Sequence, residues 1–179
     1  MVNTSESSDD YKQWTVGRIV SLFLIVVILF FWIWALSPLA PSGHPDKLDD
    51  PDFAKAAKLF CIDAEDEIEE LPLALTSKTP NERADLIDKG TEIYRNLLKA
   101  LQSIAPDPNT GDGKNIQTWI TDYEIYLNDR DLYAEKFRKG VDEAFTVSPS
   151  IKGNKWATQP IDEFSKANDL KECMVPLDV

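Results

Sequence analysis

The sequence predicts an all-α membrane protein, with a single N-terminal transmembrane helix followed by a small antiparallel helical bundle stapled by one disulfide. Three observations support this fold class. A long apolar run stands near the start of the chain. The later apolar residues recur mostly at steps of three and four, which is the spacing of one face of a helix. Two cysteines, Cys61 and Cys173, both follow the apolar run, and a pair of cysteines outside the cytoplasm favours a disulfide.

Residues 16–37 form the predicted transmembrane anchor. Between Ile19 and Leu36 the one polar residue is Ser21. At 1.5 Å per residue such a helix, with its flanks, spans a hydrocarbon core of about 30 Å. A cleaved signal peptide has a shorter apolar core and a small-residue cleavage site. Here the nearest candidate would place Pro38 directly after the cut, so we expect a permanent anchor.

Basic residues predict the orientation of this anchor. Lys12 and Arg18 precede the apolar run, and the next basic residue after it is Lys47. By the positive-inside rule the N-terminus is then cytoplasmic, and the C-terminal domain lies outside the plasma membrane of a single-pass protein. The pair of cysteines agrees with an oxidising compartment; the alternative is two unrelated buried thiols.

The segments on either side of the anchor have different compositions. Residues 1–15 are polar and predict a cytoplasmic tail. Residues 38–51 are rich in proline and predict a stiff spacer. Residues 52–179 are then expected to form one extracytoplasmic helical domain, which is large enough to bury a core.

The first two helices of this domain have clear boundary signals. The sequence DDP, residues 49–51, predicts a helix start with an acidic cap and a proline in the first turn. This helix should run to about Glu70, because Pro72 stops it. The sequence TPNE, residues 79–82, is a capping box, and the helix that it opens should end before Pro106.

The longest helical pattern covers about residues 115–145. Its apolar residues form one stripe: Ile116, Trp119, Ile120, Tyr123, Tyr126, Leu127, Tyr133, Phe137, Val141 and Phe145. The sequence SPSIKGNKW then predicts an irregular crossing. A short last helix begins around Pro160 and should bring Cys173 back toward the first helix of the bundle.

Composition excludes some functions. The chain has 31 acidic and 19 basic side chains, a net charge of −12; three acidic and two basic residues precede residue 38, so the remainder carries −11. This acidic balance argues against binding to nucleic acid or to anionic lipid headgroups. The one histidine, His44, lies in the spacer, and no catalytic, cofactor or metal motif stands out. We therefore expect no enzyme, no cofactor and no metal.

The candidate ligand residues lie on the longest helix. Arg130 would act as a carboxylate clamp beside Tyr126, one helical turn away. The aromatic cleft around them would be lined by Trp119, Tyr123, Tyr126, Tyr133 and Phe137. The alternative is that the aromatic stripe is core packing, and that Arg130 belongs to a satisfied polar network beside Asp122 or Asp129.

Two further motifs have ordinary explanations. The sequence DPNTGDGKNIQT, from Asp107, superficially resembles a calcium loop, but Gly111, Asp112 and Thr118 stand where an EF-hand needs an oxygen ligand, a glycine and a glutamate. We therefore expect a connection between helices; the alternative is a loose calcium contact by Asp107 and Asp112. The sequence DAEDEIEE, residues 63–70, spreads six carboxylates around a helix. It predicts a solvated face or, alternatively, a surface for a cationic partner.

The layout resembles a group of uncharacterised single-pass membrane proteins of actinobacteria. The similar motifs are the anchor, Cys61, RADLIDKGTEIY, WITDYEIYLNDRDLYAEKFRKGVDEAF, PIDEF and the closing CMVP. The resemblance covers most of the chain from residue 53 onward and implies a bacterial plasma membrane. The group has no assigned activity, so the resemblance assigns no functional residue.

The function that these features predict is binding. We expect a membrane-anchored, extracytoplasmic module that engages a partner protein of the cell envelope, with the acidic surface giving electrostatic preference. The alternative is a small-ligand receptor with an aromatic cleft around Tyr126 and Arg130.

Overall fold

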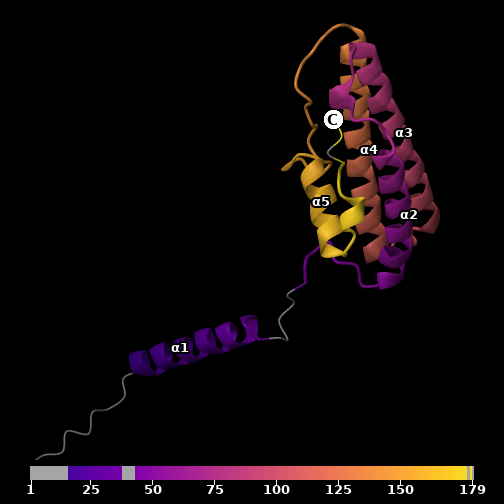
Figure 1. The fold of residues 1–179 in the computed structure, drawn as a ribbon. Helices are drawn as coiled ribbons and strands as arrows, with labels where there is room; N and C mark the ends of the chain where they lie inside the picture. The colour runs from indigo at the N-terminus through magenta and orange to yellow at the C-terminus, as the bar shows by residue number, and fades with distance from the viewer. Residues whose placement is uncertain (1–15, 38–42, 177, 179) are drawn as a thin grey trace, which may run out of the picture. The chain divides into compact units, whose positions relative to one another are not determined.

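The chain separates into two units, Met1–Gly43 and His44–Val179. The computed structural model describes residues 16–37, 43–176 and 178 (Figure 1). The predicted cytoplasmic tail, residues 1–15, and residues 38–42 of the predicted spacer lie outside the described residues.

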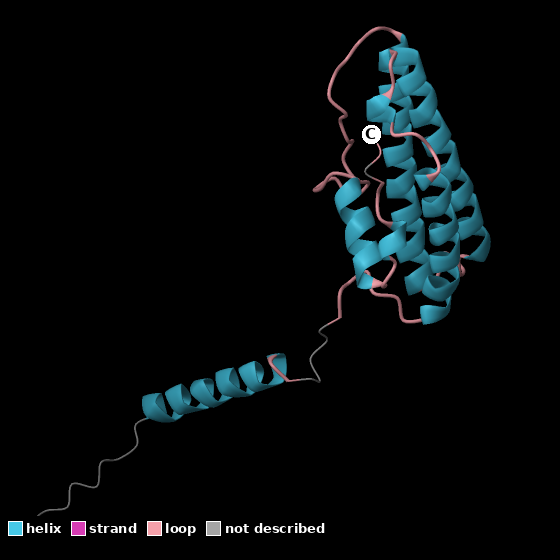
Figure 2. Ribbon diagram, viewed as in Figure 1, coloured by secondary structure: helices cyan, strands magenta, loops and turns pink. Residues whose placement is uncertain are grey.

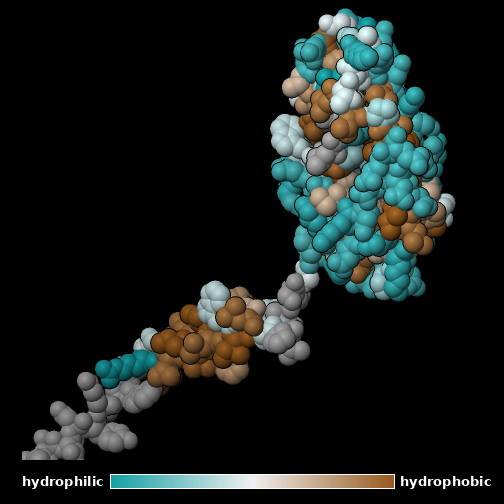
Figure 3. Space-filling model, in the orientation of Figure 1, coloured by the Kyte–Doolittle hydropathy of each residue, from teal (hydrophilic) through white to brown (hydrophobic). Residues whose placement is uncertain are grey.

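The described part of the first unit is essentially one helix, α1, Val16–Ala35. None of its residues is buried, and apolar side chains cover its surface in Figure 3. Its length and composition suffice to cross a bilayer. The predicted apolar helix is therefore confirmed.

The second unit is a helical bundle. Its long helices α2 (Pro51–Glu69), α3 (Pro80–Ile104) and α4 (Gly111–Arg138) run antiparallel to their neighbours, and α5 (Thr158–Ala167) packs on α4 (Figures 1 and 2). Two short 3-10 turns, η1 (Ala74–Thr76) and η2 (Lys171–Cys173), pack on α3 and α2 respectively. In the described ranges the only β-type contact is an isolated bridge between Pro149 and Trp156. The predicted all-α bundle is confirmed.

The helix starts follow local chemistry. The carboxylate of Asp50 accepts a hydrogen bond of 2.9 Å from the backbone N–H of Asp52, with Pro51 in the first turn of α2. Thr79 and Glu82 form the reciprocal capping box of α3. These side chains satisfy N–H groups that a helix leaves without internal partners, so both predicted starts are correct.

The end of α4 differs from the prediction. The helix begins at Gly111, capped by Thr110, and ends at Arg138, before the predicted limit near residue 145. Gly140 adopts φ +74°, a left-handed conformation that ends helices and that glycine adopts at little cost. The chain then folds back, and the Phe145 ring packs against Tyr126 and Tyr133, which explains why its apolar spacing imitated a longer helix.

The core is closed by the predicted disulfide. Cys61 of α2 is bonded to Cys173 of η2, and both are fully buried. Leu48 is also buried, and its backbone N–H donates to the Oδ1 of Asn168 at 2.9 Å. Residues 44–51 therefore belong to the folded unit, and the predicted spacer to residue 51 was too long.

Candidate functional site

Arg130 lies in a polar socket between α3 and α4. Its side chain is 0% exposed. Its Nε donates to the Oγ1 of Thr91 at 3.0 Å, its Nη1 to the hydroxyl of Tyr126 at 3.4 Å, and its Nη2 to the carbonyl of Ile87 at 3.5 Å. Helices on two sides therefore fix the plane of the guanidinium, leaving one edge for another acceptor.

Asp178 supplies that acceptor. Its two carboxylate oxygens accept hydrogen bonds of 2.6 and 2.7 Å from Nη1 and Nη2 of Arg130. Burial alone would lower the pKa of Arg130, but the hydrogen bonds and charge of Asp178 outweigh it and raise that pKa. The pair is a bidentate carboxylate clamp, the strongest form of such a contact, and we call it the Arg130–Asp178 clasp.

Gly90 makes room for the clasp. A Cβ atom at this position would lie 2.9 Å from Nη2 of Arg130, 2.9 Å from Oδ2 of Asp178 and 3.2 Å from the side chain of Ile68. These distances are shorter than van der Waals contact, so a side chain here would push the carboxylate off the guanidinium. The glycine in α3 is therefore part of the socket.

Buried tyrosines hold the segment between η2 and Asp178. The Tyr123 hydroxyl lies 2.7 Å from the carbonyl of Cys173 and 3.0 Å from that of Met174, and the Tyr126 hydroxyl donates to the carbonyl of Pro176 at 3.3 Å. Burial raises the pKa of both tyrosines above its ordinary value. Both hydroxyls are therefore neutral donors that fasten the C-terminal segment to α4.

The structure shows how far Arg130 and the aromatic stripe of α4 form a ligand cleft and how far they form core packing. Tyr123, Tyr126 and Arg130 do come together, but all three are buried. Asp122 accepts from the hydroxyl of Ser150 and the backbone of Ile151. Asp129 similarly binds the hydroxyl and backbone of Ser148. Neither aspartate pairs with Arg130, so the predicted polar network exists with a different acid.

An apolar groove lies beside the clasp. It has a volume of about 700 Å³, and Asp178 is one of its lining residues. Its apolar lining comes from the end of α2, the turn into η1, α3 and the segment after η2: Ile68, Leu71, Leu73, Leu86, Val175 and Pro176. Leu73 is 60% exposed at its rim. In Figure 3 apolar residues gather beside the C-terminal end of the chain on an otherwise mainly hydrophilic surface. We call this feature the Leu73 groove.

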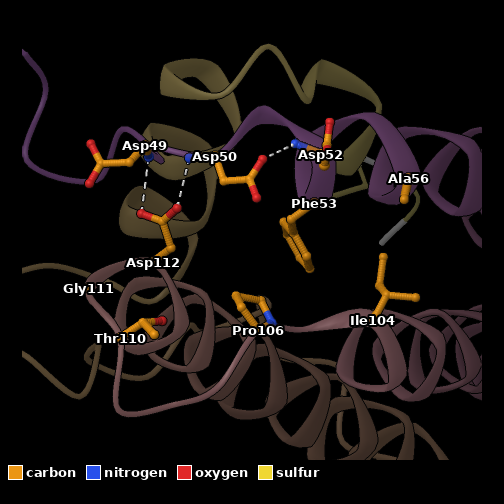
Figure 4. A pocket seen from close by; sticks show the side chains of 10 residues that line it. All are labelled: Asp49, Asp50, Asp52, Phe53, Ala56, Ile104, Pro106, Thr110, Gly111 and Asp112. Carbon is orange, nitrogen blue, oxygen red and sulfur yellow. Dashed lines mark hydrogen bonds between the residues drawn. The ribbon is translucent and has the colours of Figure 1, made fainter.

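A second cavity, of about 510 Å³, lies at the opposite end of α2 (Figure 4). Phe53 and Pro106 face each other across it, and aspartates line its rim. Asp112 accepts hydrogen bonds from the backbone of Asp49 and Asp50, at 3.1 and 3.0 Å. This carboxylate therefore orders the start of α2. No group of three or more histidine, cysteine, aspartate or glutamate residues in the described ranges is arranged to hold a metal.

Sequence reasoning missed three residues of the socket: Asp178, Gly90 and Thr91. Arg130 and Asp178 are 48 positions apart, and no periodicity relates a helix to an irregular segment at that distance. Gly90 was the one of the three with a local signal, because a glycine inside a helix costs about 1 kcal/mol relative to alanine and packing can offset that cost.

We compared the chain with protein-family models, with known proteins and with solved structures, and no match was found.

Proposed function

We propose that the protein is a membrane-anchored binding module, whose helical unit is held outside the plasma membrane and engages another protein of the cell envelope through the Leu73 groove. The orientation rests on the basic residues Lys12 and Arg18 before the anchor. The bacterial setting rests on the resemblance of the sequence motifs to actinobacterial single-pass proteins. The proposal includes no catalytic step.

The observation that carries this proposal is the exposed apolar rim of the groove. Leu73, which lines the groove, is 60% exposed; Leu75, two residues further along the chain, is 65% exposed but is not part of the lining. Single exposed leucines are common on proteins, but an exposed leucine that lines a concave, mainly apolar groove is typical of a protein-binding site. A partner side chain entering the groove would cover this surface and fill its volume.

The test is site-specific photocrosslinking in intact cells. A photoreactive residue replaces Leu73 in the full chain, and the matched control replaces Leu59, which is 65% exposed on α2 but does not line the groove. We expect one recurrent cross-linked protein from position 73 and not from position 59. Equal yields at the two positions, or no product at position 73, would overturn the proposal.

The second candidate function is a receptor for a small carboxylate ligand at Arg130 and Tyr126. The bidentate geometry of the clasp favours it, since the socket is built to hold a carboxylate. Asp178 already occupies that position, so a ligand would have to displace it. A thermal shift produced by a small carboxylate in Asp178→Ala, and abolished by adding Arg130→Ala, would favour this function over the groove.

A further inference from the structure

The acidic run at the end of α2 lacks partners, and it lies along the Leu73 groove. Among the described residues, none of the six carboxylates between Asp63 and Glu70 has a basic nitrogen within 4.0 Å. Elsewhere in the unit, many exposed carboxylates do form such pairs, including Asp85 with Arg138 and Glu163 with Lys155. The run is therefore a stretch of uncompensated negative charge.

Two members of this run belong to the groove lining. Glu65 and Glu69, one helical turn apart on α2, line the groove together with the apolar residues. The groove lining has two other carboxylates, and both are already neutralised. Glu172 accepts a hydrogen bond from Lys58, and Asp178 accepts from Arg130. The hydrogen bond from Lys58 lowers the pKa of Glu172. The wall formed by α2 therefore keeps a negative charge that the unit itself does not neutralise.

The remaining basic group on the lining is Lys171, on η2. This short turn packs on α2, and no ion pair of Lys171 is found in the described residues. The lining carboxylates without an ion pair thus both lie on α2, and most of the other lining residues are apolar. A segment that fits this surface has apolar side chains for the floor and basic side chains on the flank that faces α2.

We infer that the occupant of the Leu73 groove is a basic, amphipathic segment of the partner protein, held by Glu65 and Glu69 on one flank and by the apolar floor beneath. This inference rests on the proposed function and names the chemistry of the partner. Oppositely charged surfaces favour the right partner and disfavour acidic ones. An amphipathic helix in a groove is a common form of such recognition.

Other occupants fit less well. A second copy of the chain brings a net charge of −12 to an acidic wall. Its exposed loop with Ile151 and Trp156 carries Lys152 and Lys155, but both are already paired, with Asp46 and Glu163. Anionic lipid headgroups would be repelled by the same acidic wall.

The experiment uses the full chain in nanodiscs of zwitterionic lipid and three fluorescent synthetic peptides. The first has leucines every three or four positions with lysines between them, the second has glutamates in place of the lysines, and the third has serines in place of the leucines. Binding is measured by fluorescence anisotropy, and the signal from empty nanodiscs is subtracted. We expect the leucine–lysine peptide to bind and the other two to bind at least about tenfold more weakly, because each lacks one of the two interactions.

Matched variants locate the interaction. Glu65→Gln with Glu69→Gln removes the two groove carboxylates, and Asp63→Asn with Glu67→Gln removes two carboxylates with the same spacing on the same helix that do not line the groove. Each exposed ion pair contributes little alone, but the first pair of substitutions removes two of them together, so it should weaken binding by about fivefold. The second pair should change it by less than about twofold, since more distant charges are screened.

Failure of this inference is distinguishable from failure of the proposed function. If position 73 cross-links a partner but the leucine–glutamate peptide binds as well as the leucine–lysine peptide, or both variant pairs weaken binding equally, the inference is wrong and the function stands. Self-association of the full chain in sedimentation, lost in Leu73→Ser, would replace the basic partner by a second copy. If the peptide binds as expected but position 73 cross-links nothing in cells, the proposed function is wrong.

Discussion

At the scale of single residues, the buried charge of Arg130 is neutralised by one carboxylate, that of Asp178, which lies 48 positions away in the sequence. Asp178→Asn keeps the size of the side chain but leaves a buried guanidinium without its counter-charge. We expect this variant to lose about 3 kcal/mol of unfolding free energy, measured by urea denaturation of the full chain in detergent. Asp142→Asn, at an exposed position, is the control and should change the unfolding free energy by less than about 0.5 kcal/mol. Equal losses in the two variants would show that the clasp does not stabilise the fold.

Gly90 in the middle of α3 and Gly111 at the start of α4 give opposite predictions. Gly90→Ala places a Cβ atom 2.9 Å from both members of the clasp, so we expect a loss of about 1–3 kcal/mol from overpacking. In Gly111→Ala the new atom meets nothing within 4 Å, and the expected change is zero or a gain of up to about 1 kcal/mol, because alanine favours a helix. Thermal unfolding of both variants side by side tests the pair, and a gain in Gly90→Ala would contradict the crowded geometry of the socket.

The buried tyrosines predict loss of stability in alkali. Burial raises the pKa of Tyr94, Tyr123 and Tyr126 in the folded state above 10.0. Above pH 10 the unfolded chain therefore releases these protons while the folded chain keeps them. The contribution of the three tyrosines to the free energy of unfolding is thus fully present below this pH and is lost as the pH rises. The slope should approach about 1.4 kcal/mol per pH unit for each tyrosine. Urea denaturation between pH 9 and about 11.5 measures it, and in Tyr94→Phe the slope should fall by about a third.

At the scale of elements, the sequence predicted what local chemistry decides. The starts of α2 and α3 depend on caps that act within four residues, so Asp50 and Thr79 revealed them. The end of α4 was missed because Phe145 continues the apolar spacing although Gly140 has already ended the helix. The clasp could not be predicted for another reason. Asp178 reaches Arg130 through an irregular segment after η2, and the path of such a segment has no periodic pattern in the sequence.

The link between α2 and η2 gives the prediction at this scale. Cys61 and Cys173 are 112 positions apart, and closing a loop of that length stabilises a protein by about 4–5 kcal/mol in the chain-entropy model. Cys61→Ala with Cys173→Ala should lower the unfolding free energy by a similar amount in urea, and a reducing agent should do the same to the unaltered chain. An unchanged midpoint in both experiments would show that the disulfide does not stabilise the unit.

At the scale of the whole molecule, the proposed orientation predicts which lysines face the outside of the cell. A membrane-impermeant amine reagent added to intact cells should label the exposed Lys89 and Lys114 of the helical unit. Lys12, before the anchor, should react only after the membrane is opened. Peptide mass spectrometry reads out all three sites. Labelling of Lys12 in intact cells, with Lys89 protected, would reverse the orientation.

The disulfide has a consequence for when the binding surface exists. One wall of the Leu73 groove is the segment that follows Cys173. Where thiols are kept reduced, this wall has lost its covalent attachment to α2. In the proposed orientation, the link between this wall and α2 would therefore form only after the unit has crossed the membrane and been oxidised there. Such timing would separate synthesis from capture of the proposed partner, because the groove would be fully fixed only in the compartment that the proposal assigns to the unit.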